Sequence, residues 1–151
     1  MRILALTVDY PPFIGGIAKL HYEIKKGFTD EECLILAPRV ENAKVEKSVL
    51  RLCWTKNGVG KFLDIINWLL QSLHCVRVFR PNVILIGALF PLGVLGPLLS
   101  FFTGVPYVLL AHGSEIPIES YSWWRRTIGK WVLEKSRAVS ACSSYTQNRV
   151  H

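Results

Sequence analysis

Short, nearly uninterrupted apolar runs alternate along the chain with longer segments in which apolar residues recur every three or four positions. An uninterrupted run is typical of a strand buried on both faces of a sheet, and the longer spacing is typical of an amphipathic helix. Strands are predicted at residues 2–8, 33–38, 48–54, 82–87, 106–112 and 137–143. Helices are predicted at residues 17–28, 59–80, 91–104 and 122–136, and the start of a further helix at 144–151. This alternation predicts an α/β domain with a Rossmann-like, doubly wound parallel sheet and helices on both faces.

Apolar stripes indicate which face of each helix packs against the sheet. In the first helix the stripe consists of Ile17, Leu20, Ile24 and Phe28. In the second helix it consists of Phe62, Ile66, Leu69, Leu70 and Leu73. The third helix is predicted to be kinked at Pro97 or to start there.

Residues 82–111 carry no formal charge, so a membrane-spanning segment at 83–111 is an alternative to a strand–helix–strand unit. Pro91, Pro97 and Pro106, together with several glycines, divide this stretch into strand and helix lengths. Buried parallel strands are themselves this apolar. We therefore favour the strand–helix–strand interpretation.

The 151 residues correspond to one domain, with a net charge of +7 and a sequence pI near 9.4. This charge favours anionic partners: nucleotides, phosphates, nucleic acids or anionic membranes. Cys33, Cys53, Cys75 and Cys142 each stand in an apolar run, so buried free thiols and a reducing, cytoplasmic location are expected. Asp9 and two prolines follow the first apolar run too soon for a signal peptide.

The stretch "YPPFIGGIAKL" connects the first strand to the first helix. In a doubly wound sheet such a loop lies where ligands bind, and a helix N-terminus favours a phosphate. Gly15 and Gly16 would let an anionic ligand approach the backbone, while Pro11 and Pro12 restrain the loop. The alternative is a tight turn that requires positive φ. The motif is neither a dinucleotide fingerprint nor a P-loop, because the glycine spacing and the Lys-Ser/Thr pair are missing.

The stretch "LLAHGSEI" places His112 at the end of the fifth strand. The usual strand order makes the first, fourth and fifth strands neighbours, so His112 and the glycine pair would open onto one crevice. There the imidazole could hydrogen-bond a substrate hydroxyl or a phosphate. Gly113 would allow close approach, and Glu115 could orient a partner or accept a proton. The alternative for His112 is a strand-end residue bonded to backbone.

Together, "DYPPFIGGIA", "GVPYVLLAHGSEI" and "SRAVSACSSYTQNRV" resemble the N-terminal domain of family-4-type glycosyltransferases of the GT-B fold, over nearly the whole chain. The resemblance implies one half of a two-domain enzyme. The N-terminal half mainly holds a glycan or lipid-linked acceptor, and the C-terminal half mainly holds a nucleotide-sugar donor. It also implies transfer with retention of configuration, without a bound metal ion and with the nucleotide sugar as co-substrate rather than a cofactor.

By the same resemblance, Gly15 and Gly16 lie near the donor diphosphate and His112 contacts the transferred sugar. Ser143 and Ser144 match the segment that faces the cleft. The donor-binding domain is absent from residues 1–151, so we expect a fragment that is inactive alone. The missing domain would be supplied in cis or by a separate chain.

The stretch "SYSWWRRTIGKWVLEK" mixes Trp123, Trp124 and Trp131 with four basic residues. This mixture suits an anionic membrane surface and could also bind nucleic acid. The ordinary interpretation, which we favour, places the tryptophans in the core and the charges in solvent. The membrane interpretation implies a lipid-linked acceptor and a peripheral enzyme at the inner membrane face. Nucleic acid is not expected as a partner.

Three functional hypotheses follow. The first is the acceptor-side half of a glycosyltransferase. The second is a non-catalytic Rossmann-like module that binds a nucleotide or a protein. The third is a small membrane protein that spans the bilayer with residues 83–111.

Overall fold

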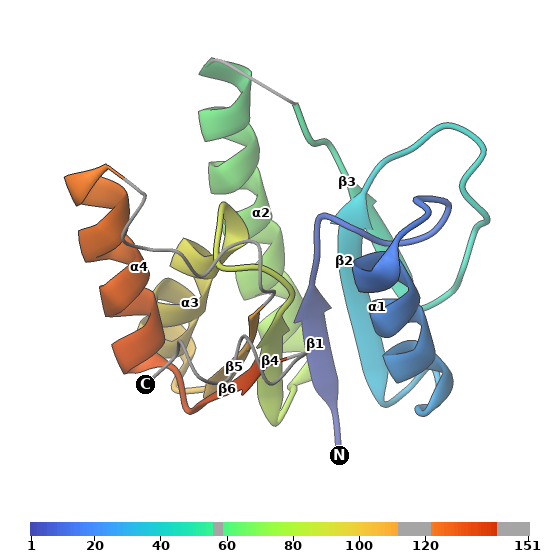
Figure 1. Cartoon of the computed structure of the whole chain (residues 1–151). Helices are drawn as coiled ribbons and strands as arrows, with labels where there is room; N and C mark the ends of the chain where they lie inside the picture. The colour runs from blue at the N-terminus through green and yellow to red at the C-terminus, as the bar shows by residue number, and fades with distance from the viewer. Residues whose placement is uncertain (56–58, 112–121, 142–151) are drawn as a thin grey trace.

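The computed structural model describes residues 1–55, 59–111 and 122–141, and these form a six-stranded sheet with helices packed against it (Figure 1). The strands are β1 (Ile3–Leu6), β2 (Cys33–Pro38), β3 (Val49–Leu52), β4 (Val83–Ile86), β5 (Tyr107–Ala111) and β6 (Ala138–Ala141). The helices are α1 (Gly16–Lys26), α2 (Val59–Phe79), α3 (Leu95–Thr103) and α4 (Trp123–Lys135), with a 3-10 turn η1 (Leu92–Val94) before α3. Each predicted element within these ranges is present, and Pro97 lies in the first turn of α3.

All neighbouring strands pair in parallel, in the order β3-β2-β1-β4-β5-β6. Ile3 of β1 is opposite Cys33 on one side and Val83 on the other. The order therefore reverses between β1 and β4. In open α/β sheets, ligands bind outside the carboxyl ends of the strands at such a reversal. The prediction of a Rossmann-like doubly wound sheet with β1, β4 and β5 adjacent is confirmed.

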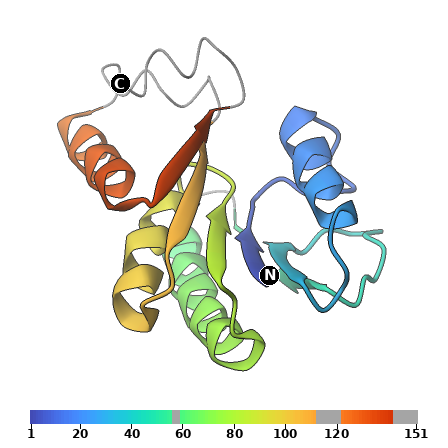
Figure 2. The same cartoon turned by 90° about the horizontal axis from the view of Figure 1, so that it is seen from below.

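Helices cover both faces of the sheet, with α2, α3 and α4 on one face and α1 on the other (Figure 2). Alternate residues of β1 point to opposite faces, as expected for a strand. Leu4 and Leu6 join a core cluster with Trp68 of α2, Leu99 of α3 and Val132 of α4. The second cluster lies on the α1 face and contains Ala5, Tyr10, Cys33, Ile35 and Ala37.

The buried face of α2 differs in part from the predicted stripe, because Leu69 and Leu73 pack against the core as predicted but the other three members do not. Phe62, Ile66 and Leu70 are exposed, whereas Trp68 is fully buried and its indole N–H donates to the carbonyl of Cys53 at 2.9 Å. The first half of α2 is apolar around most of its circumference, so the spacing alone does not select a face. The buried face is determined by Trp68, whose large ring packs in the core and whose N–H finds an acceptor in the carbonyl of Cys53.

The tryptophans of α4 also depart from the expectation. Trp123, Trp124 and Trp131 are 80%, 47% and 36% exposed, so their predicted place in the core is wrong. The buried residues of α4 are Gly129 and Val132, which are small enough to let the helix pack closely over η1 and α3.

Residues 83–111 form β4, η1, α3 and β5. The longest helix among these elements, α3, has nine residues, whereas a span needs about 20. The alternative of a membrane span at 83–111 is therefore wrong. Across the described ranges, none of the helices has both the length and the apolar character needed to cross a bilayer.

The thiols divide into two environments. Cys33 and Cys75 are buried, as predicted, and burial raises the pKa of each thiol. Cys53 follows β3 and is exposed, so the expectation that it is buried is wrong. Cys142 lies outside the described residues.

The contact between α3 and β5 supplies a test of the fold. A Cβ at Gly96 would lie 2.6 Å from the Tyr107 ring, whose hydroxyl donates to the carbonyl of Val132. Gly96→Ala should therefore lower the free energy of unfolding by about 1–3 kcal/mol, although alanine favours helix. Urea unfolding followed by circular dichroism measures this. Ser100→Ala in the same helix is the control, and an equally stable Gly96→Ala protein would contradict the packing.

Candidate functional site at the carboxyl edge of the sheet

The candidate site is built on the loop that joins β1 to α1 beside the strand-order reversal (Figure 1). Thr7 is the first residue after β1 and is buried. Its hydroxyl donates to the carbonyl of Asp9 at 2.9 Å and accepts the amide hydrogen of Asp9 at 3.1 Å. This compact turn directs the chain away from the sheet and toward α1.

A buried histidine sets the position of α1. The Nδ1 of His21 donates to the carbonyl of Ile17 at 2.9 Å and lies 3.4 Å from the Thr7 hydroxyl. A Cβ at Gly87, directly after β4, would lie 2.5 Å from Nε2 of His21. Position 87 therefore has to be glycine for the ring to fit. The ring brings the start of α1 against the ends of both β1 and β4.

The back of the loop is held by Tyr10 and Arg51. Tyr10 is fully buried, and its hydroxyl donates to Glu46 at 3.2 Å. Burial, reinforced by the neighbouring Glu46 carboxylate, raises the pKa of this hydroxyl, so it remains a donor at neutral pH. Arg51 of β3 lies over the Tyr10 ring and donates from Nη2 to the carbonyl of Pro11 at 2.6 Å. A charged donor of this kind is stronger than a neutral one.

The front of the loop is open at Gly15 and Gly16. Gly15 has extended backbone (φ 169°), and Gly16 does not have positive φ. A Cβ at either position would meet nothing within 4 Å. The alternative interpretation, a tight turn that requires positive φ, is therefore not supported. Neither backbone conformation nor packing within the described residues requires glycine here.

Among the described residues, no side chain caps the amino end of α1, where the N-cap position is Gly15. The first turn of the helix contains no acidic residue. The first N–H groups of a helix have no partner within the helix, and together they present a partial positive charge. Lys19 stands one turn further along and lines a hollow together with Gly15 and Gly16. This end of α1 is suited to an anionic group.

Two hollows meet at the loop. One, of about 440 Å³, is lined by Phe13, Ile14, Gly15, Gly16 and Lys19 together with Pro11 and Tyr22. The other, of about 530 Å³, is lined by the same Pro11 and Tyr22 and by Pro12, Asn42, Lys44 and Glu46. The two hollows share Pro11 and Tyr22, so they adjoin each other between the start of α1 and the β2–β3 connection. We call these two adjoining hollows the groove. The groove combines an aromatic ring with amide, amine and carboxylate groups, a set that can hydrogen-bond hydroxyl-rich ligands.

Of the predicted site residues, the structure describes Gly15 and Gly16. His112, Gly113, Glu115, Ser143 and Ser144 lie outside the described residues. β5 ends at Ala111, next to β4, and β6 ends at Ala141. The parallel sheet thus brings the strands that precede His112 and Ser143 to the same edge as the glycine loop.

The prediction missed two supporting residues. His21 stands within the apolar spacing formed by Ile17, Ile24 and Phe28, and a polar residue in such a stripe is a usable signal. Arg51 is a charged residue inside a predicted strand, which is a weaker signal of the same kind.

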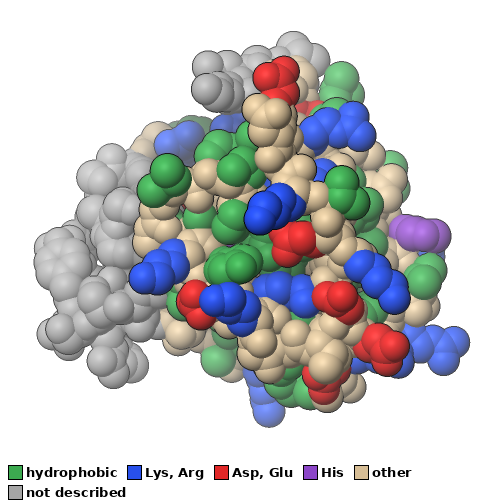
Figure 3. Space-filling view, turned by 90° about the vertical axis from the view of Figure 1, so that its right-hand side faces the viewer, with side chains coloured by type: hydrophobic (Ala, Val, Ile, Leu, Met, Phe, Trp, Pro, Cys, Tyr) green, Lys and Arg blue, Asp and Glu red, His purple; other side chains and the backbone are tan. Residues whose placement is uncertain are grey.

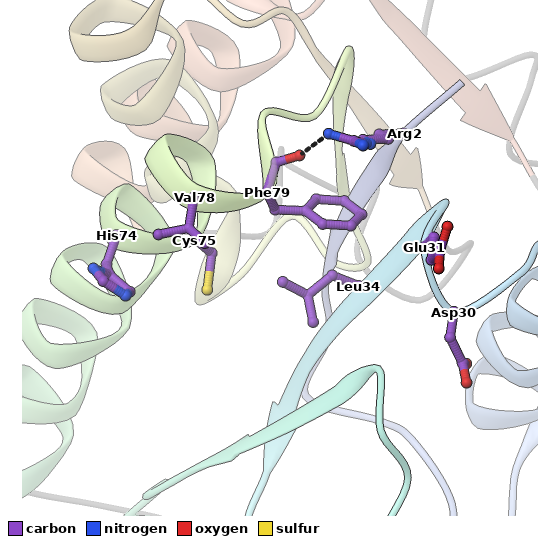
Figure 4. Close-up of a pocket in the computed structure, with 8 residues that line it drawn as sticks. All are labelled: Arg2, Asp30, Glu31, Leu34, His74, Cys75, Val78 and Phe79. Atoms are coloured by element: carbon purple, nitrogen blue, oxygen red, sulfur yellow. Dashed lines mark hydrogen bonds between the residues drawn. The ribbon is translucent and has the colours of Figure 1, made fainter.

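A further pocket, of about 440 Å³, lies at the opposite edge, near the amino ends of β1 and β2. Arg2 there donates to the carbonyl of Phe79, and the side chains of Leu34 and Cys75 lie between His74 and the acidic pair Asp30–Glu31 (Figure 4). Asp30 is engaged by Lys25 and Ser48, which hold the pKa of its carboxyl below its usual range. These groups do not converge on a ligand.

The sequence profile described as Glycosyltransferase Family 4 matches residues 14–151, which begin at the glycine loop. The chain belongs to glycosyltransferase family 4. No match was found among curated protein sequences.

Solved structures show that the fold of this chain recurs in other proteins. HepE from Anabaena in complex with UDP superimposes with a TM-score of 0.66 and 17% identity, covering 99% of this chain and 40% of HepE. HepE in complex with UDP-glucose superimposes with a TM-score of 0.64 and 17% identity, and it covers the same shares of the two chains. L-Threonine 3-dehydrogenase from Trypanosoma brucei superimposes with a TM-score of 0.51 and 12% identity, covering 74% of this chain and 36% of the dehydrogenase. The family-4 chain spans about 40% of the length of HepE.

The Arg51 contact gives a testable prediction about the loop. Arg51→Gln should destabilise residues 10–16 by about 2 kcal/mol, because it removes a charged hydrogen bond to Pro11 and the cation over Tyr10. Amide hydrogen exchange measures the loss of protection in this loop. Arg39→Gln, an exposed arginine just after β2, is the matched control. Unchanged protection in the Arg51→Gln protein would show that the loop is held by other contacts.

Proposed function

We propose that the chain is the acceptor-side domain of a retaining glycosyltransferase. The enzyme moves a sugar from a nucleotide-sugar donor to a glycan or lipid-linked acceptor without a bound metal ion. The observation that carries the proposal is the uncapped glycine end of α1 at the β1–β4 reversal, where neither backbone conformation nor packing requires glycine. Membership of family 4 and the UDP and UDP-glucose bound by HepE support the same class of donor.

The proposed role of the loop is electrostatic. The leaving nucleoside diphosphate gains negative charge as the glycosidic bond breaks. N–H groups at Gly15, Gly16 and the first turn of α1 stabilise that charge, and Lys19 adds a full positive charge nearby. Preorganised donors of this type are worth about 3–4 kcal/mol in a closed site. The support from Arg51 and His21 keeps these donors in place before the ligand arrives.

The proposed sugar-side residues follow the neighbouring strands. His112 contacts the transferred sugar, Gly113 allows its close approach, and Glu115 orients it or accepts a proton. Ser143 and Ser144 face the cleft. The groove past Tyr22 toward Asn42 and Glu46 then lies where an acceptor would extend away from the diphosphate.

The proposal includes a second, donor-binding domain, in cis or as a separate chain, because residues 1–151 span 40% of HepE. Closure of two domains would exclude water and so protect the donor from hydrolysis. Residues 1–151 alone bind nucleotide weakly and do not turn over. A lipid-linked acceptor would place the enzyme in the cytoplasm, as a peripheral protein at the inner face of the membrane.

The double substitution Gly15→Ala with Gly16→Ala tests the phosphate role. Both Cβ atoms enter open space, so the free energy of unfolding should stay within about 1 kcal/mol of wild type or rise. The same atoms obstruct a phosphate, so affinity for UDP and UDP-glucose should fall at least about tenfold. Isothermal titration with UDP, UDP-glucose and other nucleoside diphosphates measures affinity, and urea unfolding measures stability.

Gly27→Ala, at the other end of α1, is the matched control and should leave nucleotide affinity unchanged. Equal affinities in the double variant and wild type would contradict the phosphate role. Sugar transfer itself is assayed on the natural gene product that contains this chain. Nucleotide binding without transfer to any acceptor there would favour the non-catalytic module instead.

A further inference from the structure

Helices α3 and α4 lie side by side on the flank of the molecule farthest from α1 (Figures 1 and 2). Phe101 and Phe102 at the end of α3 are 82% and 62% exposed, and their rings meet edge to face at 5.3 Å. Trp131 of α4 and Phe101 line a shared hollow of about 310 Å³ between the helices. Trp124 lies seven residues before Trp131, two helical turns away and therefore on the same side of α4. We call these four aromatic residues, with Lys130 and Lys135, the α3–α4 flank.

Exposed aromatic side chains at this density are unusual for a surface that meets only water. Isolated apolar residues on a surface need no explanation, but a contiguous group marks an interaction site. The members of this group come from two helices that pack against each other, and their large rings face outward while Gly129 and Val132 occupy the buried side of α4. The flank thus presents an apolar surface whose scaffold is rigid.

The charge on this side has one predominant sign. From 122 to 141 the sequence contains five basic residues, Arg125, Arg126, Lys130, Lys135 and Arg137, and one acidic residue, Glu134. α3 has no charged residue. The α1 side differs, because acidic and basic side chains are interspersed there (Figure 3). Within the described ranges, ion pairs such as Lys25–Asp30 and Lys26–Glu23 belong to that side.

We propose that the α3–α4 flank docks on the surface of an anionic lipid bilayer. Aromatic and apolar side chains enter the headgroup region, and the surrounding cations are attracted to anionic lipids. An uncharged α3 beside a cationic α4 fits this surface better than a nucleic acid, whose phosphates would face α3 without a cation. α4 begins at the carboxyl edge of the sheet, the edge at which the glycine loop also lies, while the groove itself lies on the α1 side.

The docking itself does not depend on the proposed sugar transfer. Binding of anionic vesicles without binding of nucleotide would support the docking and contradict the proposed function. Binding of nucleotide without binding of vesicles would support the proposed function and contradict the docking. The two proposals therefore fail separately.

Co-sedimentation with phosphatidylcholine vesicles, with and without phosphatidylglycerol, tests the docking. The 151-residue chain should bind the anionic vesicles, and binding should weaken as salt is raised. Lys130→Gln with Lys135→Gln should weaken partitioning about fivefold for each cation removed. Lys26→Gln with Lys47→Gln removes the same charge from the α1 side and is the matched control. Its partitioning onto anionic vesicles should weaken much less.

The aromatic contribution is tested separately. Trp124→Ala with Trp131→Ala should weaken binding about tenfold at constant charge. Phe62→Ala, an exposed aromatic residue of α2, is its control. In bilayers with brominated acyl chains, tryptophan fluorescence of the wild-type chain should be quenched, and less so in the double variant. Trp68 is fully buried and serves as an internal reference.

Several results would overturn the docking proposal. They are equal binding to neutral and anionic vesicles, no vesicle binding at all, and equal losses in the control variants. Self-association of the chain through these aromatic residues, seen by light scattering and abolished by the double tryptophan variant, would show that a second copy occupies the flank instead. The lysine variants alter only exposed side chains, so they keep the test valid if the tryptophan variant folds poorly.

Discussion

The parallel pairing of β1 with β2 on one side and β4 on the other is the constraint on which the molecule depends. The connection after β1 leads to β2 on one side, and the connection after β4 leads to β5 on the other. The two connections therefore diverge and leave the carboxyl ends of β1 and β4 uncovered. The amino end of α1 is placed at that opening by the sheet order, before any side chain is considered. The candidate site is a consequence of topology that particular residues then refine.

Those residues act from behind the loop and leave its front clear. Arg51 and Tyr10 hold the proline segment from the β3 side, and the His21 ring occupies the space that Gly87 provides. These contacts order the backbone without covering Gly15 and Gly16. Donors that are already fixed need no rearrangement when charge develops on a ligand, which is how such a loop can stabilise a leaving diphosphate.

The sequence predicted the sheet well because buried parallel strands are continuous apolar runs that stand out from amphipathic helices. It predicted helix faces less well. α2 is apolar around most of its first half, so burial of Trp68 instead of Phe62 depends on the fit of one ring to the sheet and to the carbonyl of Cys53. In α4 the expectation that tryptophans are buried outweighed the charges beside Trp131. Such choices are made by tertiary packing, which a one-dimensional pattern does not contain.

The same limit applies to the site. Gly15 and Gly16 were found because glycine pairs after a strand are visible in sequence. Arg51 is 40 positions away from its acceptor, Pro11, and no local pattern connects them. Exposure of Cys53, one residue past β3, depends on where the strand ends. A sequence pattern does not locate the end of a strand to within one residue.

The central claim is that the glycine loop and the segment after β5 form one pocket for a nucleotide sugar. An NMR titration of the isotope-labelled chain with UDP-glucose tests this most directly, because it detects weak binding residue by residue. The account predicts that amide signals of Gly15, Gly16 and Gly113 shift together along one binding curve, and that His112→Ala weakens that curve. Shifts confined to one of the two segments, or separate curves for each, would contradict it.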